Sequence, residues 1–279
     1  MSDSPASSQP SDATSEALRQ RVESNPSQAS VSMVRQAIRE TGFDGLPKLL
    51  EALEADPRSG VRSAVRSARG RMEREAAQRR RVTGMYEYAR QLGGEGILLG
   101  VDEVGRGSVA GPLTVAAVAL PDEPVIWGID DSKRLTPERR ELLETQIRQH
   151  ALAIGIAHVP PADIDACGMA ASLRVAMTRA IAEAGIEPDA VLIDGLPMHV
   201  HPREIDVVHG DARVACIAAA SIVAKVTRDR IMVKADTRYP GYDFAKSKGY
   251  ASPEHIAAIR RLGLTDYHRA TFCRNFLED

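Results

Sequence analysis

The sequence predicts an α/β protein in which helices flank a mixed five-stranded sheet, preceded by a helical N-terminal extension. Five short apolar runs after residue 96 have the length and composition of strands. The last two runs alternate with helical patterns, whereas few helices accompany the first three. This order is typical of a sheet that combines parallel and antiparallel strands. Residues 31–91 instead carry apolar side chains at helical spacing, which predicts the extension.

Residues 1–30 contain nine serines and three prolines but no aromatic residue. Such a segment buries too little apolar surface to offset the entropy lost on ordering, so we expect a disordered tail.

The helical extension over residues 31–91 combines an apolar face with a row of arginines. The apolar side chains at helical spacing are Val61, Val65, Ala68 and Met72. The parallel row, named here the arginine stripe, consists of Arg58, Arg62, Arg66 and Arg69. We expect the apolar face to pack and the arginines to point outward. A basic stripe can bind nucleic acid, although a solvated helix face is its commoner role.

A glycine-rich linker over residues 93–96 leads into a second domain, expected over residues 96–279 with a helical C-terminal segment. Its strands are expected at residues 97–102, 113–120, 152–159, 190–194 and 205–209. Its helices are expected at residues 139–149, 169–184, 212–236 and 253–262. Thr136 and Pro137 suit the N-cap and the first position of the first of these helices.

Composition excludes several classes of protein. The formal net charge of −2 does not by itself indicate a nucleic-acid partner. Three widely separated cysteines fit reduced thiols better than a disulfide framework or a zinc site. The sequence has neither a secretory signal nor the run of about 18 apolar residues that a membrane span requires. We therefore expect a soluble, cytoplasmic monomer without a membrane partner.

Four acidic residues lie where predicted strands stop. Asp102 and Glu103 end the first strand, Asp194 ends the fourth, and Asp211 follows the fifth. Strand ends are where sites form in sheets with crossover helices, and carboxylates that converge there repel unless cations neutralise them. Oxygen ligands of this kind suit Mg²⁺ or Mn²⁺.

Each acid also has a simpler structural interpretation. Asp211 suits a helix N-cap, Asp194 suits a turn, and the neighbours Asp102 and Glu103 suit solvated strand-end charges. On an ideal strand those two side chains point to opposite faces, so both reach one site only if the strand ends there. Gly105 indicates that it does.

A short loop, Gly105, Arg106 and Gly107, follows the first two acids. Glycines let backbone groups approach a ligand closely, and an arginine between them can pair with a phosphate. Such backbone groups could read a 2′-hydroxyl, which distinguishes RNA from DNA. A tight hairpin turn is the alternative interpretation of the same residues.

Several motifs in order resemble those of the bacterial ribonuclease HII family. The run GVDEVGRGSVAGP at residues 100–112 is similar to the family signature, and DSKRL at residues 131–135 is similar to its second motif. Further matching segments are residues 191–195, 210–211, 217–226, 228–229, 248–250, 268–269 and Phe272. The resemblance covers roughly residues 97–272, and some family members also carry a helical extension like residues 31–91.

The resemblance implies a ribonuclease H-like fold and a metal-dependent cut on the 5′ side of a ribonucleotide, which leaves a 5′-phosphate and a 3′-hydroxyl. The implied substrates are the RNA strand of RNA–DNA hybrids and ribonucleotides embedded in duplex DNA, and the implied roles are removal of misincorporated ribonucleotides and of RNA primers. Divalent ions would activate a water and stabilise the departing 3′-oxygen.

The same resemblance assigns roles by motif position. The catalytic and metal-binding acids would be Asp102, Glu103, Asp194 and Asp211. The residues that contact the ribonucleotide and its 2′-hydroxyl would be Gly105, Arg106 and Gly107. Tyr250 would stack on the neighbouring deoxyribose, and Lys133 and Arg134 would hold phosphates. Without the family, Tyr250 is interpreted as a half-buried loop residue and the two cations as surface charges.

Four positions depart from the family pattern, and none of them removes a carboxylate. Val104 stands where alanine is common, Ser108 where proline is, Ser247 where histidine is, and Ala251 where glycine is. They put in doubt the preference for an RNA-to-DNA junction and the rate of cleavage, but not the class of reaction.

Two other functions remain open from the sequence. Acid clusters on this fold also serve other nucleases and strand transferases, which analysis of the product ends would separate. A module that binds hybrids through the arginine stripe would need neither metal nor acids. The closest histidine pair, His199 and His201, lies in a loop with flanking prolines and is interpreted as solvated rather than catalytic.

Overall fold

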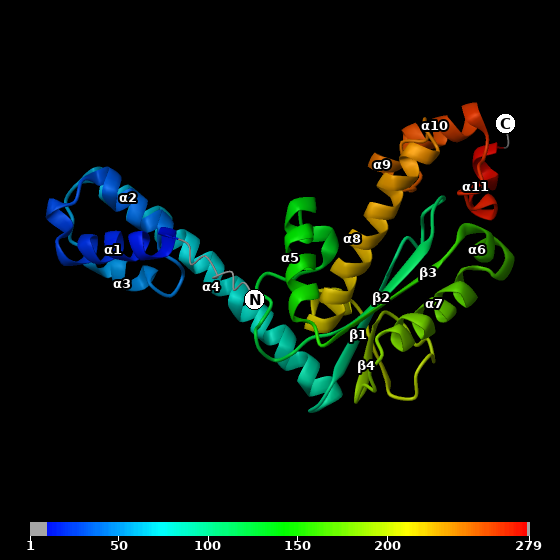
Figure 1. The fold of residues 1–279 in the computed structure, drawn as a ribbon, viewed down its shortest axis with the longest axis horizontal. Coiled ribbons are helices and arrows are strands. Elements are labelled where there is room, and N and C mark those ends of the chain that lie inside the picture. The colour runs from blue at the N-terminus through cyan, green and yellow to red at the C-terminus, as the bar shows by residue number, and fades with distance from the viewer. Residues whose placement is uncertain (1–9, 278–279) are drawn as a thin grey trace, which may run out of the picture. The chain divides into compact units, whose positions relative to one another are not determined.

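The computed structural model describes residues 10–277, which form parts of two compact units, Met1–Arg80 and Arg81–Asp279. The long helix α4 (Ser59–Gly93) contributes residues to both units. Figure 1 labels the elements, and each unit is described by itself. None of the helices in this described part is long and apolar enough to cross a membrane.

The first unit is a small helical domain. It contains α1 (Pro10–Ser24), a 3-10 turn η1 (Pro26–Gln28), α2 (Val31–Glu40), α3 (Leu46–Ala52) and the first part of α4. Its core includes side chains from all four helices, among them Val22, Val34, Leu49 and Val61. The predicted apolar face of α4 is confirmed, because Val61, Val65 and Ala68 are buried and Met72 packs against them.

The expected disordered tail is wrong over residues 10–30, and residues 1–9 lie outside the described part of the chain. Residues 10–24 form α1, whose Val22 is fully buried in the helical core. Neighbouring helices supply apolar surface that the serine-rich composition does not reveal. Ser30 then N-caps α2, because its hydroxyl accepts the N–H of Met33 at 3.2 Å.

The arginine stripe does not point outward along its whole length. Arg58 is half-buried and pairs with the buried Asp56, and it donates to the backbone carbonyls of Ala29 and Pro26 at 2.6 and 2.9 Å. It therefore ties the start of α4 to the η1 region. The other members, Arg62, Arg66 and Arg69, are exposed, and Arg69 is 2.8 Å from Glu54.

The second unit contains the mixed five-stranded sheet that the sequence predicts. The strands are β1 (Leu98–Val104), β2 (Leu113–Ala119), β3 (Ala153–Val159), β4 (Ala190–Asp194) and β5 (Glu204–Val207). Their order is β3-β2-β1-β4-β5, with β1–β2 and β2–β3 antiparallel and β1–β4 and β4–β5 parallel. The central β1 thus has an antiparallel neighbour on one side and a parallel neighbour on the other.

Helices cover both faces of this sheet (Figure 1). One face packs against α8 (Ala215–Arg238) and α5 (Pro137–His150), and the other packs against α7 (Met169–Glu183), which follows α6 (Pro161–Cys167). Alternation along β1 sends Leu99 and Val101 into the α7 core. Gly100 faces α8, and a Cβ there would collide with the backbone of Cys216 and Ile217. The missing side chain lets the start of α8 approach β1 closely.

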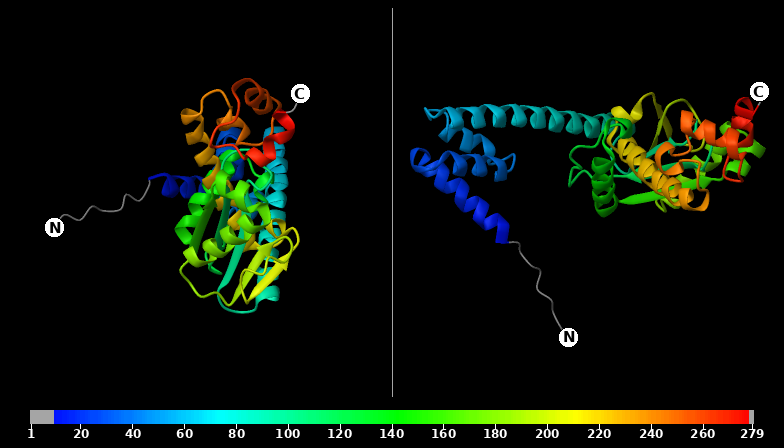
Figure 2. Two further views of the ribbon diagram at one scale, coloured as in Figure 1. Left: turned by 90° about the vertical axis from the view of Figure 1, so that its right-hand side faces the viewer. Right: turned by 90° about the horizontal axis from the view of Figure 1, so that it is seen from above.

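A cluster of short helices closes one end of the second unit, as Figure 2 shows for the orange and red segments. It comprises α9 (Phe244–Ser247), α10 (Pro253–Leu262) and α11 (Ala270–Leu277). The core of this cluster includes Val109, Met232, Phe244, Ile259 and Cys273. The sequence predicts α10, but α6, α9 and α11 are too short to be recognised from periodicity.

Candidate active site

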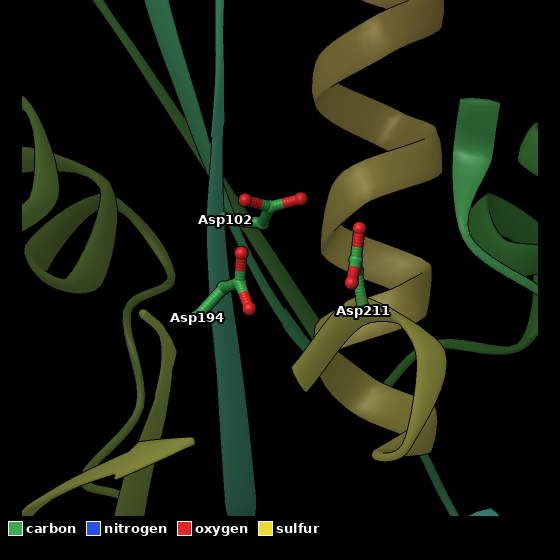
Figure 3. A group of neighbouring side chains, drawn as sticks. All are labelled: Asp102, Asp194 and Asp211. Atoms are coloured by element: carbon green, nitrogen blue, oxygen red, sulfur yellow. The ribbon is translucent and has the colours of Figure 1, made fainter. Parts of the chain in front are cut away.

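Three aspartates from different segments converge at the end of the sheet (Figure 3). Asp102 lies near the end of β1, Asp194 ends β4, and Asp211 lies in the 3-10 turn η3 (Gly210–Ala212) that precedes α8. One carboxylate oxygen of each lies within 4.8 Å of those of the other two. Asp102 and Asp211 are each only 6% exposed.

Strand pairing and one hydrogen bond explain this convergence. Val101 pairs with Ile193 in the parallel ladder, so the residues that follow each of them emerge side by side. The carboxylate of Asp194 accepts the N–H of Gly210 at 2.7 Å and thereby fixes the turn that carries Asp211. A Cβ on Gly210 would lie 2.6 Å from the Cδ1 atom of Ile217, so glycine lets this turn pack against α8 without displacing that side chain.

The electrostatics of this cluster favour a bound cation. Burial, together with the charges of Glu103 and Asp194, raises the pKa of Asp102 well above its usual range. Burial and the neighbouring Asp131 and Asp194 likewise raise the pKa of Asp211. The Nζ atom of Lys133, 3.6 Å from Asp211, neutralises part of the charge. Closely spaced carboxylate oxygens are the donor set that Mg²⁺ and Mn²⁺ prefer, so the residues fit such an ion.

Glu103 lies next to the three aspartates but outside the group whose oxygens approach within 4.8 Å. The expectation that the strand ends at residue 102 or 103 is slightly wrong, because β1 continues to Val104 and Glu103 pairs with Val115 of β2. Burial raises the pKa of Glu103, against the opposing effect of Arg106, whose guanidinium is 3.6 Å away. Glu103 thus adds negative charge at the edge of the same cleft.

A cleft of about 490 Å³ runs along the acidic cluster. The residues that line it are Asp102, Glu103, Val104, Gly105, Arg106, Gly107, Ser132, Lys133, Ser221, Lys225 and Tyr250. Five of the six residues predicted to bind substrate are therefore brought to the cleft. Arg134 is the exception among them, because it does not line the cleft and its guanidinium lies 3.7 Å from Asp130.

Two buried arginines contact the buried side of the glycine loop and the segment that follows it. Arg228 donates to Pro112 O, Ser108 Oγ and Ala110 O at 2.8, 2.7 and 3.0 Å. Gly105 has φ +85°, and a Cβ there would collide with the Arg228 guanidinium. Arg269 donates to Gly111 O and Arg106 O, at distances of 2.9–3.1 Å. The opposite side of the loop is open, because a Cβ on Gly107 would meet no atom within 4 Å.

Sequence reasoning assigned no role to several residues that build this site. Ser132 and Ser221 are joined through their hydroxyls at 2.9 Å, and Ser221 partly opposes the rise in the pKa of Asp102 that burial causes. Lys225 lies one turn after Ser221 on α8 and pairs with Asp229 at 2.8 Å. The i, i+4 spacing of Ser221 and Lys225 and the position of both within a family-like motif were the available signals.

Comparison with known proteins agrees with this geometry. The family model for ribonuclease HII matches residues 99–275. The chain belongs to the ribonuclease HII family. A model for the ribonuclease HII N-terminal domain matches residues 30–93. Membership makes the protein a nuclease of the hydrolase class and confirms the predicted ribonuclease H-like fold.

Relatives in this family cover most of the chain. Ribonuclease HII of Geobacillus thermodenitrificans is 45% identical over 224 residues, which cover 80% of this chain and 86% of that protein. Ribonuclease HII of Listeria monocytogenes is 37% identical over 245 residues, 87% of this chain and 94% of that protein. The crystal structure of ribonuclease H2 from Pyrococcus horikoshii superimposes with a TM-score of 0.56 at 26% identity, covering 64% of this chain and 96% of that one.

Proposed function

We propose that this member of the ribonuclease HII family cuts the RNA strand of RNA–DNA hybrids and cuts duplex DNA on the 5′ side of an embedded ribonucleotide. The products carry a 5′-phosphate and a 3′-hydroxyl, and the biological roles are removal of misincorporated ribonucleotides and of RNA primers. The observation that carries the proposal is that Asp102, one of three aspartates with carboxylate oxygens within 4.8 Å of one another, lines the same cleft as a glycine loop with one open side.

In this proposal Asp102, Asp194 and Asp211 hold the divalent metal, Mg²⁺ or Mn²⁺, and Glu103 contributes charge beside them. When bound, such a metal lowers the pKa of a water and stabilises the charge that develops on the leaving oxygen. The protein's own part is to orient the acids. The Glu103 amide holds Asp102 and the Gly210 amide holds Asp194, so little reorganisation is needed at the moment of reaction.

The glycine loop is proposed to recognise the ribonucleotide. Gly107 exposes its backbone to the cleft, and the Arg106 side chain is largely exposed and available to a phosphate. Backbone donors and acceptors can satisfy a 2′-hydroxyl, whereas a deoxyribose would leave them unpaired. Because Arg228 and Arg269 hold the loop from below, its shape is set before substrate binds.

Tyr250 is proposed to read the sugar that follows the ribonucleotide. Its ring lines the cleft and is 38% exposed, with the Arg228 guanidinium 5.5 Å from the ring centroid. An aromatic face packs well on a deoxyribose, and a 2′-hydroxyl would disturb this contact. Lys133, at the same cleft, is proposed to hold a backbone phosphate together with Arg134.

The decisive experiment uses a DNA duplex with one internal ribonucleotide, labelled at either end, incubated with Mg²⁺ or Mn²⁺. We expect one cut immediately 5′ of the ribonucleotide, with the ends given above, and loss of the cut in EDTA. A cyclic phosphate would indicate attack by the 2′-hydroxyl, and strand joining would indicate a transferase. Binding without metal-dependent cleavage would favour a hybrid-binding module.

A further inference from the structure

Two buried histidines in the C-terminal helical cluster lie next to the segment that carries Tyr250. His255, in α10, is fully buried, and His268 is 4% exposed. Their Nε2 atoms are 3.1 Å apart. The Nδ1 atom of His255 is 2.8 Å from the backbone carbonyl oxygen of Tyr250. The Nδ1 atom of His268 is 3.0 Å from the backbone nitrogen of Thr265 and 2.9 Å from its hydroxyl.

The partners of this pair fix the position of every ring proton. A carbonyl oxygen only accepts, so the Nδ1 atom of His255 carries a proton and donates to Tyr250. A backbone N–H only donates, so the Nδ1 atom of His268 is unprotonated and accepts from Thr265. The remaining proton of a neutral His268 is therefore on Nε2, from which it donates to the bare Nε2 of His255. Only this combination of opposite tautomers satisfies all four nitrogens.

A neutral pair is consistent with its surroundings. Burial lowers the pKa of both imidazoles, that of His268 to about 4. One ionisable neighbour is Tyr242, whose ring centroid is 4.8 Å from that of His268. The other is Asp243, whose charge raises the pKa of His255, but by less than burial lowers it. A second proton on His255 would go to Nε2 and make two N–H groups face each other across 3.1 Å, and a second proton on His268 would go to Nδ1, 3.0 Å from the backbone nitrogen of Thr265.

The histidine pair joins two segments that both hold residues 109–110, which follow the glycine loop. Val109 and Ala110 donate their N–H groups to Gly249 O at 2.8 and 3.1 Å. On the other side, Ala110 forms a β-bridge with His268, and Arg269 donates its N–H to Val109 O. The Nε2···Nε2 hydrogen bond links these two segments directly, and so closes a ring of contacts around residues 109–110.

Tyr250 is held at both ends of its backbone. Its N–H donates to Ser247 O at 3.0 Å, and its carbonyl accepts from the N–H of Ser252 and from His255, each at 2.8 Å. These bonds restrain the backbone on both sides of Tyr250, so they also restrain the direction of the Cα–Cβ bond that leads to its ring. The exposed part of the ring remains accessible to a ligand.

We propose that His255 and His268 form a tautomer-locked relay that positions Tyr250 for recognition of the RNA-to-DNA junction, which makes His255 a specificity-determining positioning residue. This inference rests on the proposed function for Tyr250. The relay acts through the Tyr250 carbonyl and touches neither the acidic cluster nor the glycine loop, so its loss changes substrate preference more than the rate on a continuous hybrid.

The test uses a matched pair of substitutions. The amide nitrogen of asparagine reaches the place of Nδ1, so His255→Asn keeps the hydrogen bond to Tyr250 and loses the one to His268. The amide of glutamine reaches the place of Nε2, so His255→Gln keeps the hydrogen bond to His268 and loses the one to Tyr250. Both variants lose one buried hydrogen bond and are expected to lose similar stability. The single-turnover rate constant is measured for a single-ribonucleotide duplex and for a long hybrid. The ratio of the first to the second is compared for wild type, both variants and Tyr250→Ala.

We expect His255→Gln to lower this ratio about three- to tenfold, the effect of one lost hydrogen bond, and His255→Asn to leave it unchanged. Equal ratios in the two variants would overturn the relay while leaving the proposed function intact, provided that Tyr250→Ala lowers the ratio. If Tyr250→Ala leaves the ratio unchanged, junction reading by Tyr250 fails, and the relay fails with it.

A second measurement does not depend on activity or on any variant. In wild-type protein labelled with ¹⁵N-histidine, one of the seven histidines should be an Nδ1–H tautomer joined to an Nε2–H tautomer by scalar coupling across an N–H···N hydrogen bond. If the two coupled rings were in the same tautomer, or if no two rings were coupled at pH 7, the proposal would be overturned.

Discussion

Replacing Asp102 by asparagine should abolish cleavage and yet make the metal-free protein more stable. The amide side chain would keep nearly the same shape, and its carbonyl oxygen could still accept the N–H of Glu103, which Asp102 accepts at 2.7 Å. The substitution removes one charge from a cluster whose oxygens lie within 4.8 Å of one another. The change in the free energy of unfolding therefore reports the charge repulsion within the site, because the packing of the side chain is nearly unchanged.

The magnitude follows from Coulomb's law. Two unit charges at 4.8 Å repel by about 3.5 kcal/mol at an effective dielectric of about 20, and by about 0.9 kcal/mol in bulk water. Asp102 and Asp211 are almost fully buried and Asp194 is only partly buried, so we expect an intermediate effect: Asp102→Asn should raise the free energy of unfolding by about 1–3 kcal/mol at pH 8.

The pH dependence has a definite sign. Folding raises the pKa of Asp102, so the charged form destabilises the native state above that pKa, and protonation removes the cost as the pH falls through it. The advantage of the variant should therefore be largest above the raised pKa of Asp102, shrink as the pH falls, and vanish below the ordinary aspartate value of 3.8.

The assay is urea denaturation in EDTA at several pH values, with Glu87→Gln as the control. Glu87 is an exposed residue of α4, so the same carboxylate-to-amide change there should alter stability by less than about 0.5 kcal/mol. Added Mg²⁺ should stabilise the wild type more than Asp102→Asn. The reasoning is refuted if the variant is no more stable than wild type at pH 8, and the site assignment is refuted if it still cleaves with Mg²⁺.

Three further predictions concern substrate binding. Tyr250→Ala should cut activity on a single-ribonucleotide duplex roughly tenfold to a hundredfold more than on a long hybrid, and equal losses would indicate a general structural role. Gly107→Ala should leave stability within about 0.5 kcal/mol, because its Cβ meets no atom, yet lower cleavage by about tenfold or more; unchanged kinetics would exclude close contact with substrate. Replacing the exposed Arg62 and Arg66 by glutamine should reduce the salt slope of duplex affinity by up to about two, whereas an unchanged slope would make them solvated residues.

The elements of the second unit that could be predicted are those with a strong local pattern. The five strands are apolar runs, and the observed β3 and β4 begin or end within one residue of their expected bounds. Helix α8 begins at Ala215, after a separate 3-10 turn, whereas the sequence predicts a helix from residue 212. Asp211 is therefore not the N-cap of a long helix, because Val214 takes that position.

What the sequence could not show depends on contacts between distant segments. The convergence of Asp102 and Asp194 requires β1 and β4 to be parallel neighbours, which no local pattern reveals. Helix α1 was missed because its buried residue Val22 stands in a serine-rich segment. Burial is also unusual for arginine, so composition alone would place Arg228 and Arg269 on the surface.

Those two arginines show why recognition is harder to infer than chemistry. Candidate metal ligands can be recognised from residue type, because carboxylates that converge repel one another unless a cation neutralises them. The shape of the glycine loop depends instead on buried side chains such as Arg228 and Arg269, which hydrogen-bond to backbone carbonyls and do not line the cleft. Arg228 bonds to Lys248 O as well as to the segment after the glycine loop, so one buried cation holds both Tyr250's segment and the loop. Substrate selectivity should therefore respond to substitutions beneath the cleft that leave the acidic cluster unchanged.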